Sequence, residues 1–180
     1  MRNGEASVRG LLERYSTRVL PLTRSGTCPS EEAETIRALS AASLPPGARA
    51  AEASIAGLLL LAGCWDESHE VSQEIGSKEG SYWHGIVHRM EPDAGNAGYW
   101  FRRVGVHPIF PELHCRALEI VKRQDLRREL KGAWDPFLFI DWCEDARRAP
   151  GSELERAMVE IQRAEWDLLF EWCALPPRNP

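Results

Sequence analysis

The sequence has no long hydrophobic run and no apolar segment near its beginning. The longest apolar stretch is Ile55–Cys64, which is ten residues, whereas a membrane-spanning helix needs roughly 20. Residues 1–10 contain an early Arg2 but no apolar core behind it, so we expect no signal peptide. The sequence therefore predicts a cytoplasmic protein with no membrane contact.

The cysteines do not occur in closely spaced pairs. There are five of them, an odd number, and none forms a CxxC motif. This pattern predicts neither a disulfide framework nor a zinc ribbon. Three of the cysteines, which lie among apolar neighbours, are expected to be small core residues: Cys64, Cys143 and Cys173.

An excess of positive charge is also absent. The formal net charge is −5 and the pI is near 5.6, which argues against a dedicated nucleic-acid-binding protein because such proteins usually present a basic face. The chain contains no GxSxG, P-loop or GxGxxG motif and no His-Asp dipeptide. Several common classes of hydrolase and nucleotide-binding protein are therefore not indicated.

No segment shows the sustained alternation of apolar and polar residues that is typical of strands. Apolar residues instead recur at helical spacing along most of the chain. We therefore expect an all-α protein, a single-domain irregular bundle of about seven or eight helices spanning 1–180, with loosely ordered ends at 1–29 and 174–180. One short helical candidate lies near 6–15. The other helices are expected near 30–43, 48–64, 66–75, 82–91, 94–104, 111–123, from 136 onward, and 152–173.

The expected helix starts carry short polar residues, whose side chains can accept hydrogen bonds from the first free backbone N–H groups. Asp135 is followed by proline, and Ser152 is followed three residues later by Glu155, as in a capping box. The residues that we predict as N-caps are Ser30, Ser81, Asp93, Asp135 and Ser152.

Four of the five histidines lie between residues 65 and 107. His84, His88 and Glu91 are spaced i, i+4 and i+7, so they share one stripe of a helix. Two imidazoles and a carboxylate could hold a divalent metal such as zinc, iron or manganese and leave a position open for water. His69 and His107 could add further ligands. The alternative is a solvated polar stripe whose histidines form hydrogen bonds with their neighbours.

The same region could instead bind an anionic small molecule without a metal. Arginine side chains are forked donors suited to carboxylate or phosphate, and the nearby aromatic residues could wall a pocket. The candidate ligand-binding residues are Arg89, Asp93, Asn96, Tyr99, Arg102 and Arg103.

The segment from 66 to 108 resembles a family of hypothetical proteins for which no activity is known. The shared motifs are DESH at 66–69, SYWHGIVHR at 81–89, EPD at 91–93, NAGYWFRRVG at 96–105 and HP at 107–108. The resemblance covers under a quarter of the chain. It implies that these residues belong together, and it implies no particular reaction.

Three functions remain open from the sequence. The first is a small-ligand-binding protein or metal-dependent, hydrolase-like enzyme with its site in residues 65–108. The second is a metal-free module that binds a carboxylate or phosphate. The third is a helical protein–protein interaction domain, suggested by the seven tryptophans. The oligomeric state is not indicated by the sequence.

Overall fold

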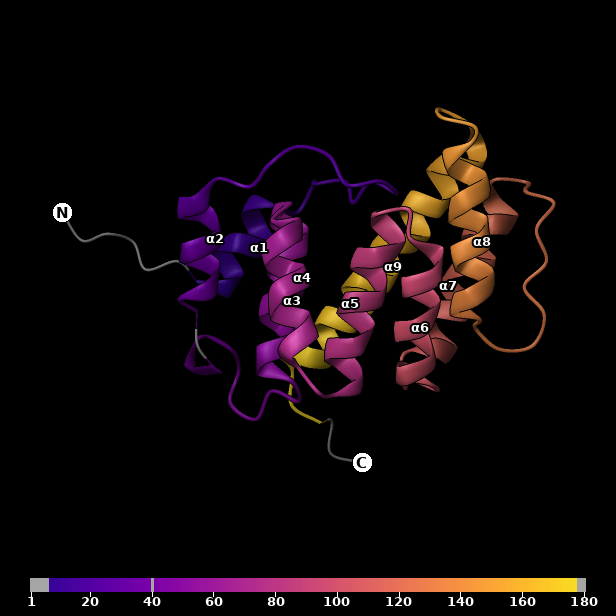
Figure 1. The fold of residues 1–180 in the computed structure, drawn as a ribbon. Helices are drawn as coiled ribbons and strands as arrows, with labels where there is room; N and C mark the ends of the chain where they lie inside the picture. The colour runs from indigo at the N-terminus through magenta and orange to yellow at the C-terminus, as the bar shows by residue number, and fades with distance from the viewer. Residues whose placement is uncertain (1–6, 40, 178–180) are drawn as a thin grey trace.

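A computed structural model describes residues 7–39 and 41–177, and within these ranges the chain forms nine α-helices, one short 3₁₀ turn and no strand. The all-α prediction is confirmed, with a helix count slightly above the expected seven or eight. In Figure 1 the helices are α1 (Val8–Arg14), α2 (Ser30–Arg37), α3 (Ala51–Ala62), α4 (Trp65–Glu74), α5 (Lys78–Met90), α6 (Ala94–Val104), α7 (Phe110–Arg123), α8 (Pro136–Arg147) and α9 (Glu153–Ala174).

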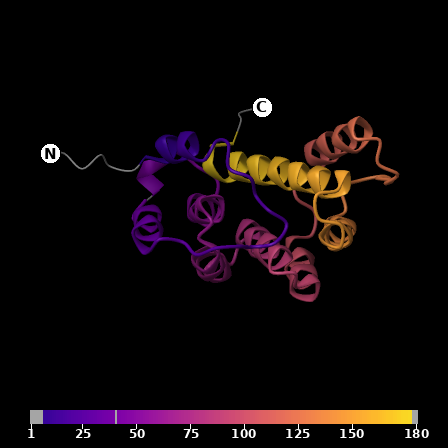
Figure 2. The same cartoon turned by 90° about the horizontal axis from the view of Figure 1, so that it is seen from above.

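The longest helix, α9, organises the bundle. Its 22 residues correspond to a length of about 33 Å, and Figure 2 shows it running along the molecule with α3 to α6 on one side. Apolar residues recur along its inward face at helical spacing, including Met158, Ile161, Leu169 and Cys173. No helix within the described ranges combines the length and apolarity needed to cross a bilayer.

Helix α3 lies at the centre, as its apolar sequence predicts. Every residue from Ala53 to Ala62 is buried. At Gly57 the helix leaves no room for a side chain, because a Cβ atom there would lie 2.7 Å from the Trp83 ring of α5. The missing side chain of Gly57 therefore lets the largest aromatic ring of α5 reach the core.

Three of the predicted N-caps are confirmed. The side chain of Asp93 accepts a hydrogen bond from the backbone of Asn96 at the start of α6. Asp135 and Ser152 accept corresponding bonds at the starts of α8 and α9. These caps form because a short acceptor followed directly by a helical pattern needs no tertiary partner.

Two predicted helix starts are wrong. Ser30 is the first residue of α2 and makes no cap, since Pro29 occupies that position, and α2 ends at Arg37 rather than near residue 43. Ser81 lies inside α5, because the Ser77 side chain accepts a bond from the Gly80 N–H and starts the helix earlier. The competing serine four residues upstream explains the second error.

The segment that follows α1 packs against the bundle. Leu20 and Leu22 are buried, and the Gln162 side chain of α9 donates to the backbone carbonyls of Leu20 and Pro21. We predicted loose order at both ends of the chain, in 1–29 and 174–180. Residues 1–6 and 178–180 of these two ranges lie outside the described residues.

A disulfide joins Cys28 to Cys64, with Cα atoms 4.6 Å apart. We predicted no disulfide framework and did not predict this single bridge. Cys64 is buried in the core, as expected, and is also bonded to Cys28. The pairing spans 36 residues of sequence and depends on the fold bringing α2 and α3 together. Cys143 and Cys173 are free and buried, as expected.

The tryptophans are mainly core residues. Trp65, Trp83, Trp134, Trp142 and Trp166 are all buried, and the remaining two are half-buried. Their abundance reflects packing of a helical core, so it does not by itself indicate an interaction surface.

Candidate metal centre

The centre lies where α4 and α5 pack together. The Ser68 hydroxyl donates to the Ala56 carbonyl at 2.9 Å and fixes α4 on α3. On the other side of α5, Gly85 allows close approach of α6, since a Cβ there would lie 3.1 Å from the Phe101 ring. As a result α5 is buried all round from Gly80 to Met90.

This burial bears on both interpretations of the histidine stripe. His84 is 2% exposed and His88 is 9% exposed, so the expectation of a solvated stripe is wrong, although both histidines form the hydrogen bonds with neighbours that this alternative predicted. Buried imidazoles need partners or ligands, because a buried polar group without one is unfavourable.

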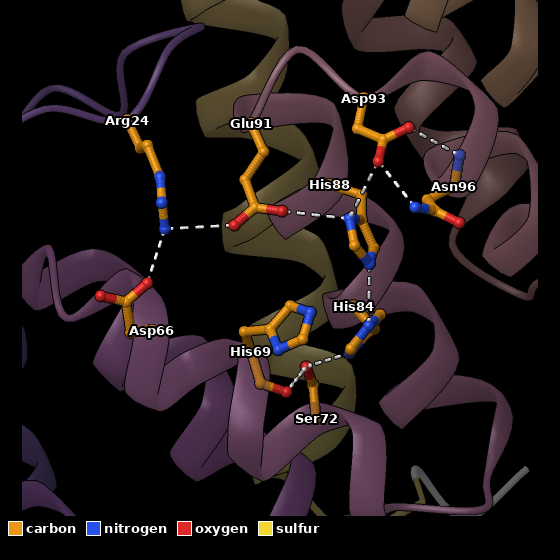
Figure 3. Close-up of polar contacts among 9 residues, drawn as sticks. All are labelled: Arg24, Asp66, His69, Ser72, His84, His88, Glu91, Asp93 and Asn96. Carbon is orange, nitrogen blue, oxygen red and sulfur yellow. Dashed lines mark hydrogen bonds and ion pairs between the residues drawn. The ribbon is translucent and has the colours of Figure 1, made fainter.

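Three imidazoles converge at this point (Figure 3). His69 comes from α4, and His84 and His88 come from successive turns of α5. One nitrogen from each residue lies within 4.8 Å of the other two, so the three residues could hold a metal ion. The Nε2 atoms of His84 and His88 are 3.0 Å apart.

These separations are compatible with a tetrahedral ion. Zn–N bonds of about 2.0–2.1 Å place two ligand nitrogens about 3.3 Å apart in a tetrahedral site. The pair from α5 is within a few tenths of an ångström of that spacing, while His69 has to move closer. His69 is only half-buried, which leaves its ring the freedom to do so.

Ser72 determines which nitrogen of His84 faces the centre. The Ser72 hydroxyl donates its single proton to the His69 carbonyl at 3.1 Å. Its oxygen is 3.0 Å from Nδ1 of His84 and must therefore accept a proton from that nitrogen. This leaves the Nε2 lone pair of His84 directed at His88 and available to a metal.

Carboxylates surround the outer nitrogen of His88. Glu91 Oε2 lies 3.1 Å from Nδ1, off the line of an ideal hydrogen bond, and Asp93 lies at 4.0 Å. Arg24 in turn contacts Glu91 at 3.1 Å and Asp66 at 2.6 Å. Figure 3 shows this chain of contacts from the loop to the histidines. Such outer partners commonly orient metal-binding histidines and raise their basicity.

His84 and His88 are held in their neutral forms. Burial, together with repulsion from His69 and His88, lowers the pKa of His84 to about 3. Burial also lowers the pKa of His88, although the charge of Glu91 opposes the shift. Metal ligands must be deprotonated, so neither residue loses protons at neutral pH on binding.

A cation and an aromatic ring border the centre. The Trp100 ring lies 4.1 Å from the His84 ring, measured between centroids. The Arg103 guanidinium lies 5.0 Å from the Trp100 ring centroid and is exposed. An exposed positive charge thus lies beside the aromatic ring that contacts His84.

The structure does not bring His107 to the cluster. Its Nε2 lies 3.7 Å from a carboxylate oxygen of Glu79, and its ring packs against Tyr82 and Trp172. Glu91 is close, but it faces the outer nitrogen of His88 rather than the convergent nitrogens. The group that could hold a metal therefore consists of His69, His84 and His88.

The residues predicted to bind an anion are dispersed. Arg89 is fully buried and pairs with Glu165, so its charge is not available to a bound anion. Asp93 and Asn96 form the N-terminal cap of α6, next to His88. The others point to different surroundings: Tyr99 is half-exposed, Arg103 stacks on Trp100, and Arg102 lies over Phe137.

Two residues of the centre were not found from the sequence. Ser72 lies three residues after His69, on the same face of α4, so its spacing was an available signal. Arg24 gave no signal, because it is 42 residues away from Asp66 in sequence. Its position depends on the loop before α2, where the Arg24 N–H donates to the Met90 carbonyl at 2.9 Å.

A second group within the described residues has ligand atoms equally close together. It consists of Cys28, Cys64 and Glu67. Because the two sulfur atoms are bonded to each other, they are not available as thiolates, and the histidine cluster is the stronger candidate.

Comparison of the chain with models of protein families, with curated proteins and with solved structures gives no match. The interpretation of the centre therefore depends on its own geometry.

Proposed function

We propose that the protein binds one divalent transition-metal ion through His69, His84 and His88 and acts as a metal-dependent, hydrolase-like enzyme on a small anionic substrate. The observation that carries the proposal is the convergence of three imidazole nitrogens within 4.8 Å. A set of three protein ligands with an open position is typical of catalytic zinc sites.

The ligand set favours some metals over others. Imidazole suits zinc and iron, whereas manganese prefers sites richer in oxygen ligands. Since Glu91 faces Nδ1 of His88, the three nearest ligands are all nitrogen. We therefore expect zinc first, iron second and manganese third.

Metal loading requires one proton shift within the cluster. In the hydrogen-bonded arrangement, His84 Nε2 carries the lone pair, so His88 donates to it from its own Nε2. To release that nitrogen as a ligand, His88 must carry its proton on Nδ1 instead. Glu91 and Asp93 lie next to Nδ1 and stabilise this tautomer.

A bound ion of this kind supplies a Lewis acid and an activated water. The residues of the chain would supply the remainder of the site. Arg103 would hold an anionic group of the substrate, and Trp100, whose ring lies close to both Arg103 and His84, would wall the site and exclude water on one side.

Elemental analysis tests the metal directly. After incubation with zinc, iron(II) or manganese(II) and gel filtration, wild-type protein should retain about one ion per chain. His84→Ala should retain none. His114→Ala is the matched control, since His114 is half-buried and outside the cluster, and it should bind as the wild type does. Wild-type protein that retains no ion from any of the three solutions would refute the proposal.

Activity is the second measurement. The zinc-loaded protein should hydrolyse anionic p-nitrophenyl phosphates, with His84→Ala inactive and Arg103→Gln raising KM more than it lowers kcat. Metal binding without hydrolysis of any such substrate would leave a structural metal site and contradict the enzymatic half of the proposal.

One observation favours a second candidate, a metal-free module. Ser72, His84, His88 and Glu91 form a continuous chain of polar contacts, which satisfies much of the cluster without an ion. This candidate predicts that chelators leave the thermal stability unchanged, whereas the metal proposal predicts a lower Tm after chelation because a ligand that binds only the folded state stabilises it.

A further inference from the structure

A groove of about 890 Å³ lies between α6, α7 and the turn at 132–137 that leads into α8. Arg102 lines this groove, and on α6 it is about 200° around the helix from Trp100. The groove is therefore on the side of α6 away from the histidine cluster. It is a separate feature from the candidate metal centre.

The lining is mainly apolar. Phe101, Phe110 and Trp134 are buried at its floor, while Val106 is 81% exposed and Phe137 is 39% exposed. Contiguous exposed apolar surface on a folded protein usually marks a binding site. Here the exposed residues border a concave space, which favours a ligand that enters the groove.

The backbone around the groove is restricted. Prolines at positions 108, 111 and 136 line it, and each fixes its own φ angle. Two of them lie in the first turns of α7 and α8. Small-molecule sites are usually largely formed before the ligand arrives, and these prolines meet that requirement.

One unpaired positive charge faces the groove. The lining contains a single carboxylate, that of Asp135, which accepts hydrogen bonds from the N–H groups of Phe137 and Leu138. Arg102 has no ion-pair partner within residues 7–39 and 41–177, and its guanidinium lies 5.6 Å from the Phe137 ring centroid. An anionic group bound here would pair with Arg102.

The floor also contains a donor that lacks a partner. The indole Nε1 of Trp134 is buried and makes no hydrogen bond with the described part of the chain. Such a donor is unfavourable, and buried Trp N–H groups usually find a partner. A ligand bound against the floor would lie next to this residue, so its N–H signal can report on binding.

We propose that this groove binds a small amphipathic carboxylate, with its apolar chain or ring on the aromatic floor and its carboxylate on Arg102. The volume is within the range of about 300–1,000 Å³ that is typical of small-molecule sites. The inference does not depend on the metal centre, and His84→Ala should bind the carboxylate as the wild type does.

Calorimetric titration with decanoate and with 1-decanol, on the full chain near neutral pH, tests the proposal. We expect one decanoate per chain and a shift of the Trp134 indole N–H signal in NMR spectra. Because Arg102 contacts only the charged head group, Arg102→Gln should weaken decanoate about tenfold and leave decanol almost unchanged. Val106→Asp, at an exposed position, should weaken both ligands.

Arg127→Gln is the matched control, since Arg127 is exposed, makes no ion pair with any described residue and lies outside the groove. It should bind both ligands normally. The proposal is overturned if neither ligand binds, if Arg102→Gln affects both equally, or if Arg127→Gln has the same effect. Light scattering that shows a dimer dissociated by Val106→Asp, together with no decanoate binding, would identify a self-association surface instead.

Discussion

Replacing Glu165 by glutamine should be among the most destabilising single changes in this protein. Glu165 of α9 pairs with Arg89 of α5, and the side chains of both residues are 0% exposed. The carboxylate also accepts from the Tyr82 hydroxyl at 3.0 Å, and Gln162 accepts from Arg89 at 3.2 Å. The pair joins two helices that are far apart in sequence.

The magnitude follows from the burial of the cation. Arginine does not lose its proton in a protein, so Glu165→Gln leaves a charged guanidinium without a counter-charge in the core. Breaking a fully buried pair in this way costs about 3–5 kcal/mol, a large part of a typical total stability of about 5–15 kcal/mol. Gln162 compensates only in part, because its amide oxygen carries no net charge.

The measurement is urea unfolding followed by circular dichroism. Glu160→Gln is a matched control on the same helix, since Glu160 pairs with Arg123 at the surface, where both side chains are about half-exposed; it should cost at most about 1 kcal/mol. The double change Arg89→Met with Glu165→Leu should be more stable than Glu165→Gln, because it removes both buried charges. A loss below about 1 kcal/mol for Glu165→Gln would refute this reasoning.

Three further results are expected. Ser72→Ala should weaken zinc binding by about 10–100-fold, measured by competition with a chromogenic chelator, because it removes the acceptor that fixes the His84 tautomer; an unchanged affinity would contradict this. Burial lowers the pKa of His107 to about 4. His107 therefore binds a proton below about pH 6.5 in the unfolded chain but only below about pH 4 in the folded protein. Stability should therefore fall across that window by up to about 3 kcal/mol, and His107→Gln should reduce this dependence in urea titrations at several pH values. Gly57→Ala should lower Tm by forcing Trp83 out of position. Gly76→Ala is the suitable control, because a Cβ there meets no neighbour within 4 Å, whereas Gly26 has a positive φ that would itself strain an alanine.

Much of the helical architecture could be predicted because its signals are local. Capping by Asp93, Asp135 and Ser152 depends on residues two or three positions away, and the burial of α3 follows from the apolar run that begins at Ile55. The prediction failed where two local signals competed, as Ser77 and Ser81 did at the start of α5. It also failed for the Cys28–Cys64 disulfide, whose partners are 36 residues apart.

The candidate site shows the same division. The spacing of His84 and His88 predicts that they share a helix face, and the structure has them on adjacent turns of α5. The third histidine comes from α4, so its choice over His107 depended on how two helices pack. The position of Arg24 next to Glu91 likewise required the fold.

The sequence by itself therefore determined the helical class, most helix ends and the pair of histidines one turn apart, because each depends on backbone geometry within a few residues. Only the tertiary structure decided which charges are buried, which side of α6 each arginine faces, and which nitrogen of His84 is free. Those properties depend on desolvation and on contacts between residues far apart in sequence. Arg89 is the clearest case: its neighbours in sequence indicated a ligand-binding residue, and its burial against Glu165 makes it part of the core.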